Sequence, residues 1–199
     1  MSTIKTTNIT HGSNSGTNNL ILDNTGKVSI AQNKLSCPGT IIQVAQVIKT
    51  DTWSESVAEG AFSAVVTGLT QAFTCSSTSN KVLITGNVYC HNGARGGWSA
   101  GLILTADGNT ITAATGDQRG SNRVRLHSIA ETYWTTNMIP INYLYSPNST
   151  SSITYGVKIW NSNDSSARTM AVNYAESVDS DTNNYFNTAS TLTLMEIAG

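Results

Sequence analysis

Side chains that alternate between apolar and polar with a period of two restrict the fold of this chain more than any other feature. In the last stretch, residues 189–199, Leu192 and Leu194 alternate with threonines. Successive side chains of a strand point to opposite faces, so this stretch is predicted to be a strand whose leucines face a core. Residues 139–145 and 153–160 follow the same period. No window keeps an apolar stripe at helical spacing over three turns, so the chain is predicted to be all-β.

Small polar side chains take the place that charged residues hold in most proteins. Ser, Thr and Asn together make up 72 of the 199 residues, and charged residues make up 12%. Because these side chains compete for backbone hydrogen bonds, they favour turns and strands over long helices. Many short strands separated by turns are typical of an antiparallel β-sandwich or jelly roll. We expect strands at 41–49, 61–66, 71–75, 81–90, 98–105, 123–130, 138–146, 152–160, 168–175 and 190–197, and a short helical turn or a loop at 52–61.

Residues 1–40 differ from the rest because they contain no Trp, Tyr or Phe. Residues 20–30 are predicted to form a hairpin around the turn Asn24-Thr25-Gly26, in which Gly supplies a positive φ. A lone hairpin is marginally stable in water, so we expect an arm that becomes ordered against other copies or a larger assembly. A flexible polar tail is the alternative. The predicted organisation is an N-terminal arm at 1–40 and a jelly-roll head at 41–199.

The charge balance argues against two classes of partner. A net charge of −1 gives no basic footprint for nucleic acid or for an anionic membrane surface. No apolar run reaches the roughly 20 residues of a membrane-spanning helix, and the amino terminus lacks the apolar segment of a secretory signal. Cys37, Cys75 and Cys90 have wide, motif-free spacing and are predicted to be free thiols. We therefore expect synthesis in a reducing cytoplasm, with no nucleic-acid partner and no membrane insertion.

No candidate for chemistry has the spacing that its mechanism requires. Cys90 and His91, with His127 elsewhere, carry the groups of a Cys/His nucleophile but match no such motif. Residues 179–190 begin like a calcium loop but lack its Gly and its bidentate Glu. Residues 93–97 precede a predicted strand, whereas a phosphate cradle precedes a helix. We predict no catalytic residue, no metal and no cofactor, hence no enzyme, although a carboxylate pair from distant strands stays possible.

Basic and aromatic residues gather in one part of the sequence. Arg123 and Arg125 alternate onto one face of an expected strand, with Arg119 before them and Tyr133 and Trp134 after. Aromatic rings stack on sugar faces and Arg makes paired hydrogen bonds, so these residues are candidates for binding a surface glycan. The same residue types are enriched where subunits pack together. Both interpretations stay open.

Several stretches resemble one known family. They are Pro38-Gly-Thr-Ile-Ile-Gln-Val44, Val66-Thr-Gly-Leu69, Thr74-Cys-Ser-Ser-Thr-Ser-Asn-Lys-Val-Leu-Ile84, Tyr145-Ser-Pro-Asn148, Thr154-Tyr-Gly-Val-Lys158 and Ser190-Thr-Leu-Thr-Leu-Met-Glu-Ile197. With these stretches the chain resembles phage fibre tips, common among marine phages, that end in a jelly-roll head. Its beginning, Met1-Ser-Thr-Ile-Lys5 with Leu22-Asp-Asn-Thr-Gly-Lys-Val28, is similar to the arm that joins such heads to a virion.

The resemblance implies a homotrimer with a tumour-necrosis-factor-like head, placed on a virion and made in a bacterial host. It implies that the arm contacts other virion proteins and that the head contacts a host cell-surface glycan or protein. Threefold packing would involve Leu22, Val28 and Ile30 in the arm and Tyr143 and Tyr145 in the head. Two alternatives stay open. One is a capsid head fibre or decoration protein with a particle-stabilising role, and the other is a virion enzyme that trims polysaccharide.

Overall fold

The computed structural model describes most of the predicted head and three short strands before it. The described residues are 8–9, 20–22, Thr25, 28–30, 37–93, 99–118, 125–131, 136–162, 166–174 and 188–199. Within these ranges the regular structure is β-strand, apart from a single short 3₁₀ turn, η1 at Thr112–Ala114. The prediction of an all-β chain is therefore confirmed.

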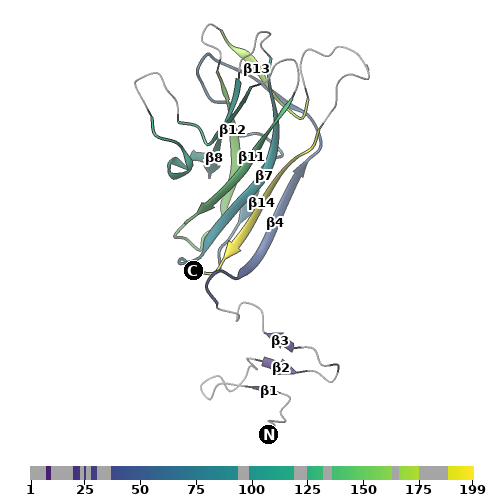
Figure 1. Ribbon diagram of the computed structural model, residues 1–199, viewed down its shortest axis with the longest axis vertical. Coiled ribbons are helices and arrows are strands. Elements are labelled where there is room, and N and C mark those ends of the chain that lie inside the picture. Colours follow the sequence, from purple (N-terminus) through teal and green to yellow (C-terminus); the bar gives the residue numbers. More distant parts are fainter. Residues whose placement is uncertain are drawn as a thin grey trace.

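The three strands nearest the N-terminus form a small antiparallel sheet in the order β1-β2-β3. Their bounds are Asn8–Ile9, Leu20–Leu22 and Val28–Ile30. Leu20 lies opposite Ile30 and Leu22 opposite Val28, so the predicted hairpin is present. Figure 1 draws this sheet apart from the two larger sheets. The side chains of Leu22, Val28 and Ile30 lie outside the described part, so their role between copies stays a prediction, as does the boundary at residue 40.

The head consists of two antiparallel sheets. The β4–β14 sheet has six strands and runs β4-β14-β7-β13-β5, with β11 also paired to β7. The β8–β12 sheet has five strands and runs β10-β8-β12-β6, with β9 paired to β8 (Figure 1). The bounds in the β4–β14 sheet are β4 Ile41–Lys49, β14 Ser190–Ile197, β7 Lys81–Asn92, β13 Arg168–Val172, β5 Trp53–Val57 and β11 Asn137–Tyr145. Those in the β8–β12 sheet are β10 Ser128–Glu131, β8 Ser99–Ala106, β12 Ile153–Asn161, β6 Gln71–Phe73 and β9 Asn109–Thr110.

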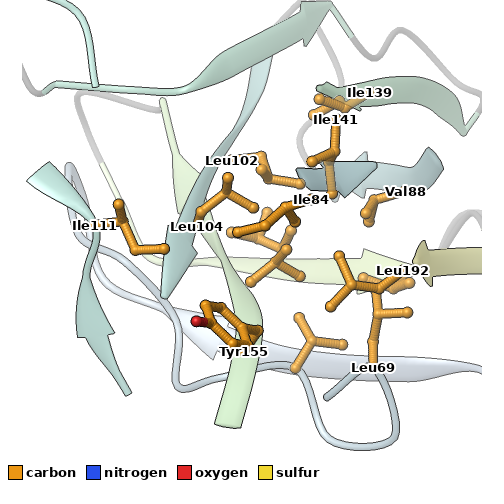
Figure 2. Close-up of a cluster of buried hydrophobic side chains, with 14 of the residues drawn as sticks. Leu69, Ile84, Val88, Leu102, Leu104, Ile111, Ile139, Ile141, Tyr155 and Leu192 are labelled. Atoms are coloured by element: carbon orange, nitrogen blue, oxygen red, sulfur yellow. The ribbon is translucent and has the colours of Figure 1, made fainter. Parts of the chain in front are cut away.

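The core fills the space between the two sheets, as in a β-sandwich of the jelly-roll type. Leu192 and Leu194 of β14 are fully buried, so the predicted orientation of the last strand is confirmed. Figure 2 shows Leu192 and Ile84 on the same interior cluster as Leu102 and Leu104 of the opposite sheet. The period of two places alternate residues of the long strands β7, β11, β12 and β14 in this cluster.

In the expected strand 123–130 the described residues 125–127 are not strand, and β10 begins only at Ser128. Two other segments depart from the sequence prediction more fully. Residues 52–61 were expected to form a helical turn or a loop, but Trp53–Val57 is a strand that pairs along its whole length with β13. Tertiary pairing, rather than any local pattern, makes this segment a strand. Conversely, 61–66 was expected to be a strand but makes only an isolated bridge between Phe62 and Trp160.

The reason for the second departure lies in the hydrogen bonds to β12. Ser63 N–H donates to Ile159 O at 2.8 Å and Val66 N–H donates to Val157 O at 3.0 Å. The chain advances three residues from Ser63 to Val66, whereas β12 advances two between Val157 and Ile159. This mismatch prevents a regular ladder of hydrogen bonds between the two segments. The chain bends and places Val66 and Leu69 in the core, where both are fully buried.

Buried asparagines join the two sheets at the end of the sandwich away from Ile41. Asn161 of β12 donates from Nδ2 to Val57 O at 3.0 Å, and Asn92 of β7 donates from Nδ2 to Asn161 Oδ1 at 3.2 Å. Asn92 also donates to Ser99 O at 3.1 Å. These bonds satisfy polar groups inside an apolar core, where an unmade bond costs about 1–3 kcal/mol. The asparagines therefore fix how the two sheets meet at this end.

The inward and outward residues of β14 give a direct test of the fold. We expect Leu194→Ala to lower the free energy of unfolding by about 2–5 kcal/mol, because it leaves a cavity in the core. Thr191→Ala, on the other face of the same strand, should change it by less than about 0.5 kcal/mol. Urea unfolding at one fixed protein concentration measures both. Equal effects of the two substitutions would contradict the orientation of β14.

Candidate functional surface

The outer face of the β4–β14 sheet is the candidate functional surface. Four strands form it, in the order β4, β14, β7 and β11. Their inward side chains belong to the core, and their register aligns the outward side chains in rows across the sheet. In Figure 1 these strands lie side by side, with no other described strand over their outer face.

One of these rows is entirely apolar. It runs Val44, Met195, Leu83 and Leu144 across the four strands, and each residue lies opposite the next. Val44 is 57% exposed and Leu144 is 46% exposed. We call these four residues the apolar row. The row is neither covered by the described chain nor interrupted by a polar residue.

A polar row lies beside it. It runs Gln46, Thr193, Thr85 and Asn142 in the same register. Gln46 Nε2 donates to Thr193 Oγ1 at 2.7 Å, so neighbouring strands are also joined by side chains on this face. The threonines that the sequence placed opposite the leucines of β14 are thus on the outer face of the sheet, beside apolar side chains, where Thr191 is half-buried and Thr193 is 9% exposed.

The exposed apolar residues concentrate on the two outer strands of this face. Among the described residues, six large hydrophobic side chains are strongly exposed, and five of them are on β4 or β11. Besides Val44 and Leu144 these are Ile41, Ile48 and Met138, and the sixth is Ile129 on β10, in the other sheet. Contiguous apolar patches of this kind mark places where a protein contacts another surface.

The face also lacks charge. On the four strands the charged residues are Lys49 and Glu196, which are buried, and Lys81, which is exposed at the end of β7. Charges on edge strands keep sheets from associating, and β4 carries none on its exposed side chains. Pro140 stands in β11 at the opposite edge. This face is therefore poor in charge and carries most of the strongly exposed apolar side chains of the described residues.

Tyr143 and Tyr145, predicted at the interface between copies, lie on the inner side of β11. Both are half-buried against the core. The ring of Tyr145 meets that of Tyr155 edge-on at 6.0 Å between centroids, and Tyr143 meets His127 edge-on at 6.2 Å. The outward residues of the same strand are Met138 and Leu144. The alternation was visible in the sequence, but which half of it faced the core was not.

The predicted glycan-binding residues are described only in part. Arg125 is exposed, just before β10. Arg119, Arg123, Tyr133 and Trp134 lie outside the described residues, so glycan binding by this group stays a prediction.

The strand ends on either side of residues 132–135 are described. The residues between β10 and β11, which include Tyr133 and Trp134, connect Glu131, opposite Ser99, with Asn137, opposite Cys90. Both positions are at the end of the sandwich away from Ile41 and Ile197, where Asn92 also bonds to Asn161.

The cysteine and histidine pair considered for nucleophilic chemistry is inside the protein. Cys90 and His91 are buried, and burial raises the pKa of the Cys90 thiol well above its ordinary value. Burial, with a smaller contribution from the charge of Glu196, raises the pKa of Cys75 to about 11. All three cysteines are free thiols, as predicted. The buried thiols of Cys75 and Cys90 are expected to react slowly, because their raised pKa leaves little thiolate at neutral pH.

The described ranges contain neither a metal-binding cluster nor a membrane-spanning helix. No group of three or more His, Cys, Asp or Glu residues there is placed to hold a metal ion. In the same ranges, no helix has the length and apolar character needed to span a membrane.

Comparison with known proteins adds a distant likeness in shape. No protein-family model matches the chain. No curated protein matches it either. Among solved structures, that of infectious bursal disease virus Gt strain aligns at 16% identity with a TM-score of 0.38, over 78% of this chain and 38% of the other. T=1 particles derived from infectious bursal virus align at 17% identity with a TM-score of 0.40, over 79% and 36%. The chain thus spans little more than a third of these proteins, and likenesses this weak carry no argument about function.

The burial of the thiols leads to a prediction about their reactivity. At pH 8 we expect a maleimide to label the exposed Cys37 at least about a hundredfold faster than Cys75 or Cys90, because thiolate and access are both scarce at the buried sites. Mass spectrometry of proteolytic peptides gives the three rates separately. Fast labelling of Cys90 in the folded protein would contradict its place in the core.

Proposed function

We propose that this protein is a non-enzymatic structural component of a virion, and that copies of it associate through the outer face of the β4–β14 sheet. The observation that carries this proposal is the apolar row, which is uncharged, continuous across four strands and uncovered by the described chain. The interface expected of Tyr143 and Tyr145 is accordingly placed on the outward residues of β11, Met138 and Leu144.

The size of the face suits a contact between proteins. Nine residues of strand extend over about 30 Å, and four strands are about 15 Å wide between the outer axes, so the face projects about 450 Å². A stable interface buries about 800 Å² of accessible surface on each partner, and accessible surface exceeds projected area because side chains are rough. Burial contributes about 25 cal/mol for each Å² of apolar surface. The face is therefore large enough to form most of an interface.

We further propose that the assembly is a homotrimer and that it acts as a tail-fibre-like appendage. Both points rest on the resemblance of the sequence to phage fibre tips. In this arrangement the arm at 1–40 joins the head to other virion proteins. The end of the head away from the arm then contacts a host cell-surface glycan or protein. A surface rich in Ser, Thr and Asn and poor in charge supports glycan contact through hydrogen bonds rather than through long-range attraction.

Charge placed on the apolar row tests the association. We expect Val44→Lys with Leu144→Lys to convert a trimer into monomers, because buried lysines without partners oppose association. Ile129→Lys is the matched control, since Ile129 is as exposed as Val44 but lies on the other sheet. Analytical ultracentrifugation measures the mass of each protein, and circular dichroism checks the fold. A wild-type protein that stays monomeric at high concentration, or a double variant that stays trimeric, would refute the proposed interface.

Binding to cells tests the role in adsorption. We expect the purified protein to adsorb to cells that the parent virus infects and to reduce infection when it is added first, because it occupies the same receptors. Gold-labelled antibodies on intact particles should mark an appendage. A protein that labels the capsid and neither binds cells nor blocks infection would instead have the particle-stabilising role.

A further inference from the structure

Glu196 is a fully buried carboxylate that the assembly surface does not use. It lies on the inner side of β14, two residues after Leu194. Oε1 accepts hydrogen bonds from Ser76 N–H at 2.6 Å, Ser76 Oγ–H at 2.8 Å and Asn80 Nδ2 at 2.6 Å. Oε2 accepts one from Gln43 Nε2 at 2.6 Å. The described residues provide no lysine or arginine as an ion-pair partner for it.

These donors come from separate parts of the chain. Gln43 is on β4, and Ser76 and Asn80 are in the connection between β6 and β7. One carboxylate therefore ties the end of β14 to the strand beside it and to residues 74–80. The partners are 116 to 153 positions away in the sequence, so each bond holds together segments that the chain itself does not.

The same region is where the chain enters the head. Gly39 N–H donates to Ala198 O at 2.8 Å, and Ala198 N–H donates to Thr40 O at 2.9 Å. Gly199 N–H donates to Asn80 Oδ1 at 3.2 Å, so Asn80 bonds both to the last residue and to Glu196. Residues 39–43, 74–80 and 196–199 are thus one connected network, which we call the base clamp.

The base clamp suits only the charged form of Glu196. Backbone N–H and side-chain amide NH₂ groups donate and cannot accept. Ser76 Oγ already accepts from Asn80 Nδ2 at 3.2 Å. A proton on Oε2 would face Gln43 Nε2, and a proton on Oε1 would face two N–H donors and the Ser76 hydroxyl, whose second lone pair could accept it only if the hydroxyl turned round. Protonation would therefore break or reverse at least one of the four bonds.

The electrostatics agree with this geometry. Burial alone would raise the pKa of Glu196, but the hydrogen bonds from Asn80, Ser76 and Gln43 outweigh it and hold that pKa below the ordinary value. Cys75 is the titratable group that faces it from 74–80, and Tyr155 of β12 adjoins Cys75. Lys81 lies opposite Ile197 and so is on the other face of the sheet. With its pKa lowered in the folded state, Glu196 stabilises the clamp at neutral pH, and this stabilisation is lost as the pH falls through the folded value.

We propose that Glu196 is an acid-released latch. In its charged form it closes the base of the head, and on protonation it frees residues 74–80 and uncovers Cys75 while the sandwich core stays folded. Leu192 and Leu194, which β14 places on the same inner face as Glu196, are apolar and do not titrate, and the thiol of Cys75, the core residue that faces Glu196, stays neutral in acid because its pKa is raised. Protonation in acid therefore breaks hydrogen bonds of the base clamp and leaves the apolar packing between the two sheets in place. This proposal does not depend on the association of copies.

Cys75 is a built-in reporter of this opening. In a Cys37→Ser background, labelling with an aromatic disulfide that reacts at acid pH follows Cys75 and Cys90 separately by peptide mass spectrometry. We expect the rate at Cys75 to rise at least about tenfold, relative to Cys90, as the pH falls below the ordinary range of a glutamate, because local opening exposes one site and not the other. Circular dichroism over the same range should be unchanged.

Variants separate the latch from general acid sensitivity. Glu196→Gln should label quickly at Cys75 already at pH 7, with no further rise in acid. Gln43→Leu removes one of the donors to Glu196, together with the bond from Gln43 Nε2 to Thr74 O at 2.7 Å, and should move the rise to higher pH. Glu55→Gln is the control, because Glu55 also accepts hydrogen bonds from a backbone N–H, that of Ala64, but lies away from the clamp. Equal rises at Cys75 and Cys90, a flat profile at Cys75, or a wild-type profile in Glu196→Gln would each overturn the proposal.

Discussion

The pairing of β14 with two strands at once is the constraint on which the head depends. The last strand of the described chain lies between β4, the first strand of the head, and β7 from its middle. The β4–β14 sheet is therefore incomplete until residues 190–197 are in place. Contacts this distant in sequence close large loops, which makes such a topology slow to form but cooperative once it is formed. The same strand supplies Leu192 and Leu194 to the core, so sheet and core are completed in one step.

The two faces of β14 have different roles: one packs into the core, and the other belongs to the outer face of the sheet. Its inner side holds the core and the Glu196 clamp, whereas its outer side contributes Met195 to the apolar row and Thr193 to the polar row. A shift of one residue in register would exchange the two sets, exposing leucines and burying threonines. The alternation thus fixes the fold and the assembly surface together. The bulge between Glu196 and Ile197 is confined to the last pair with β4, so it does not disturb either row.

The sequence was most informative where the period of two is long and unbroken. It located Ile41–Lys49 and Ser190–Ile197 at their observed bounds and oriented the leucines of β14. It failed where long-range contacts decide, because β5 is a strand only through its pairing with β13, and 61–66 bends to bury Val66 and Leu69. The clamp was not predictable either, since the donors to Glu196 are more than a hundred positions away. The outer surface was predictable only in part. The alternation of β11 was clear from the sequence, but its exposed large apolar residues are Met138 and Leu144, and the tyrosines face the core.

The polar row affects how favourable the proposed association through this face would be. A buried polar group without a hydrogen bond destabilises an interface, so a row of four polar residues would ordinarily oppose association. Here Gln46 and Thr193 already bond to each other, and part of the hydrogen-bonding need of the row is met within one chain. In the proposed assembly, the polar groups on Thr85 and Asn142 would form hydrogen bonds across the interface when the two copies are in the right register. In that assembly the apolar side chains would supply the area of the contact, and the polar row would favour one alignment of the copies over the others.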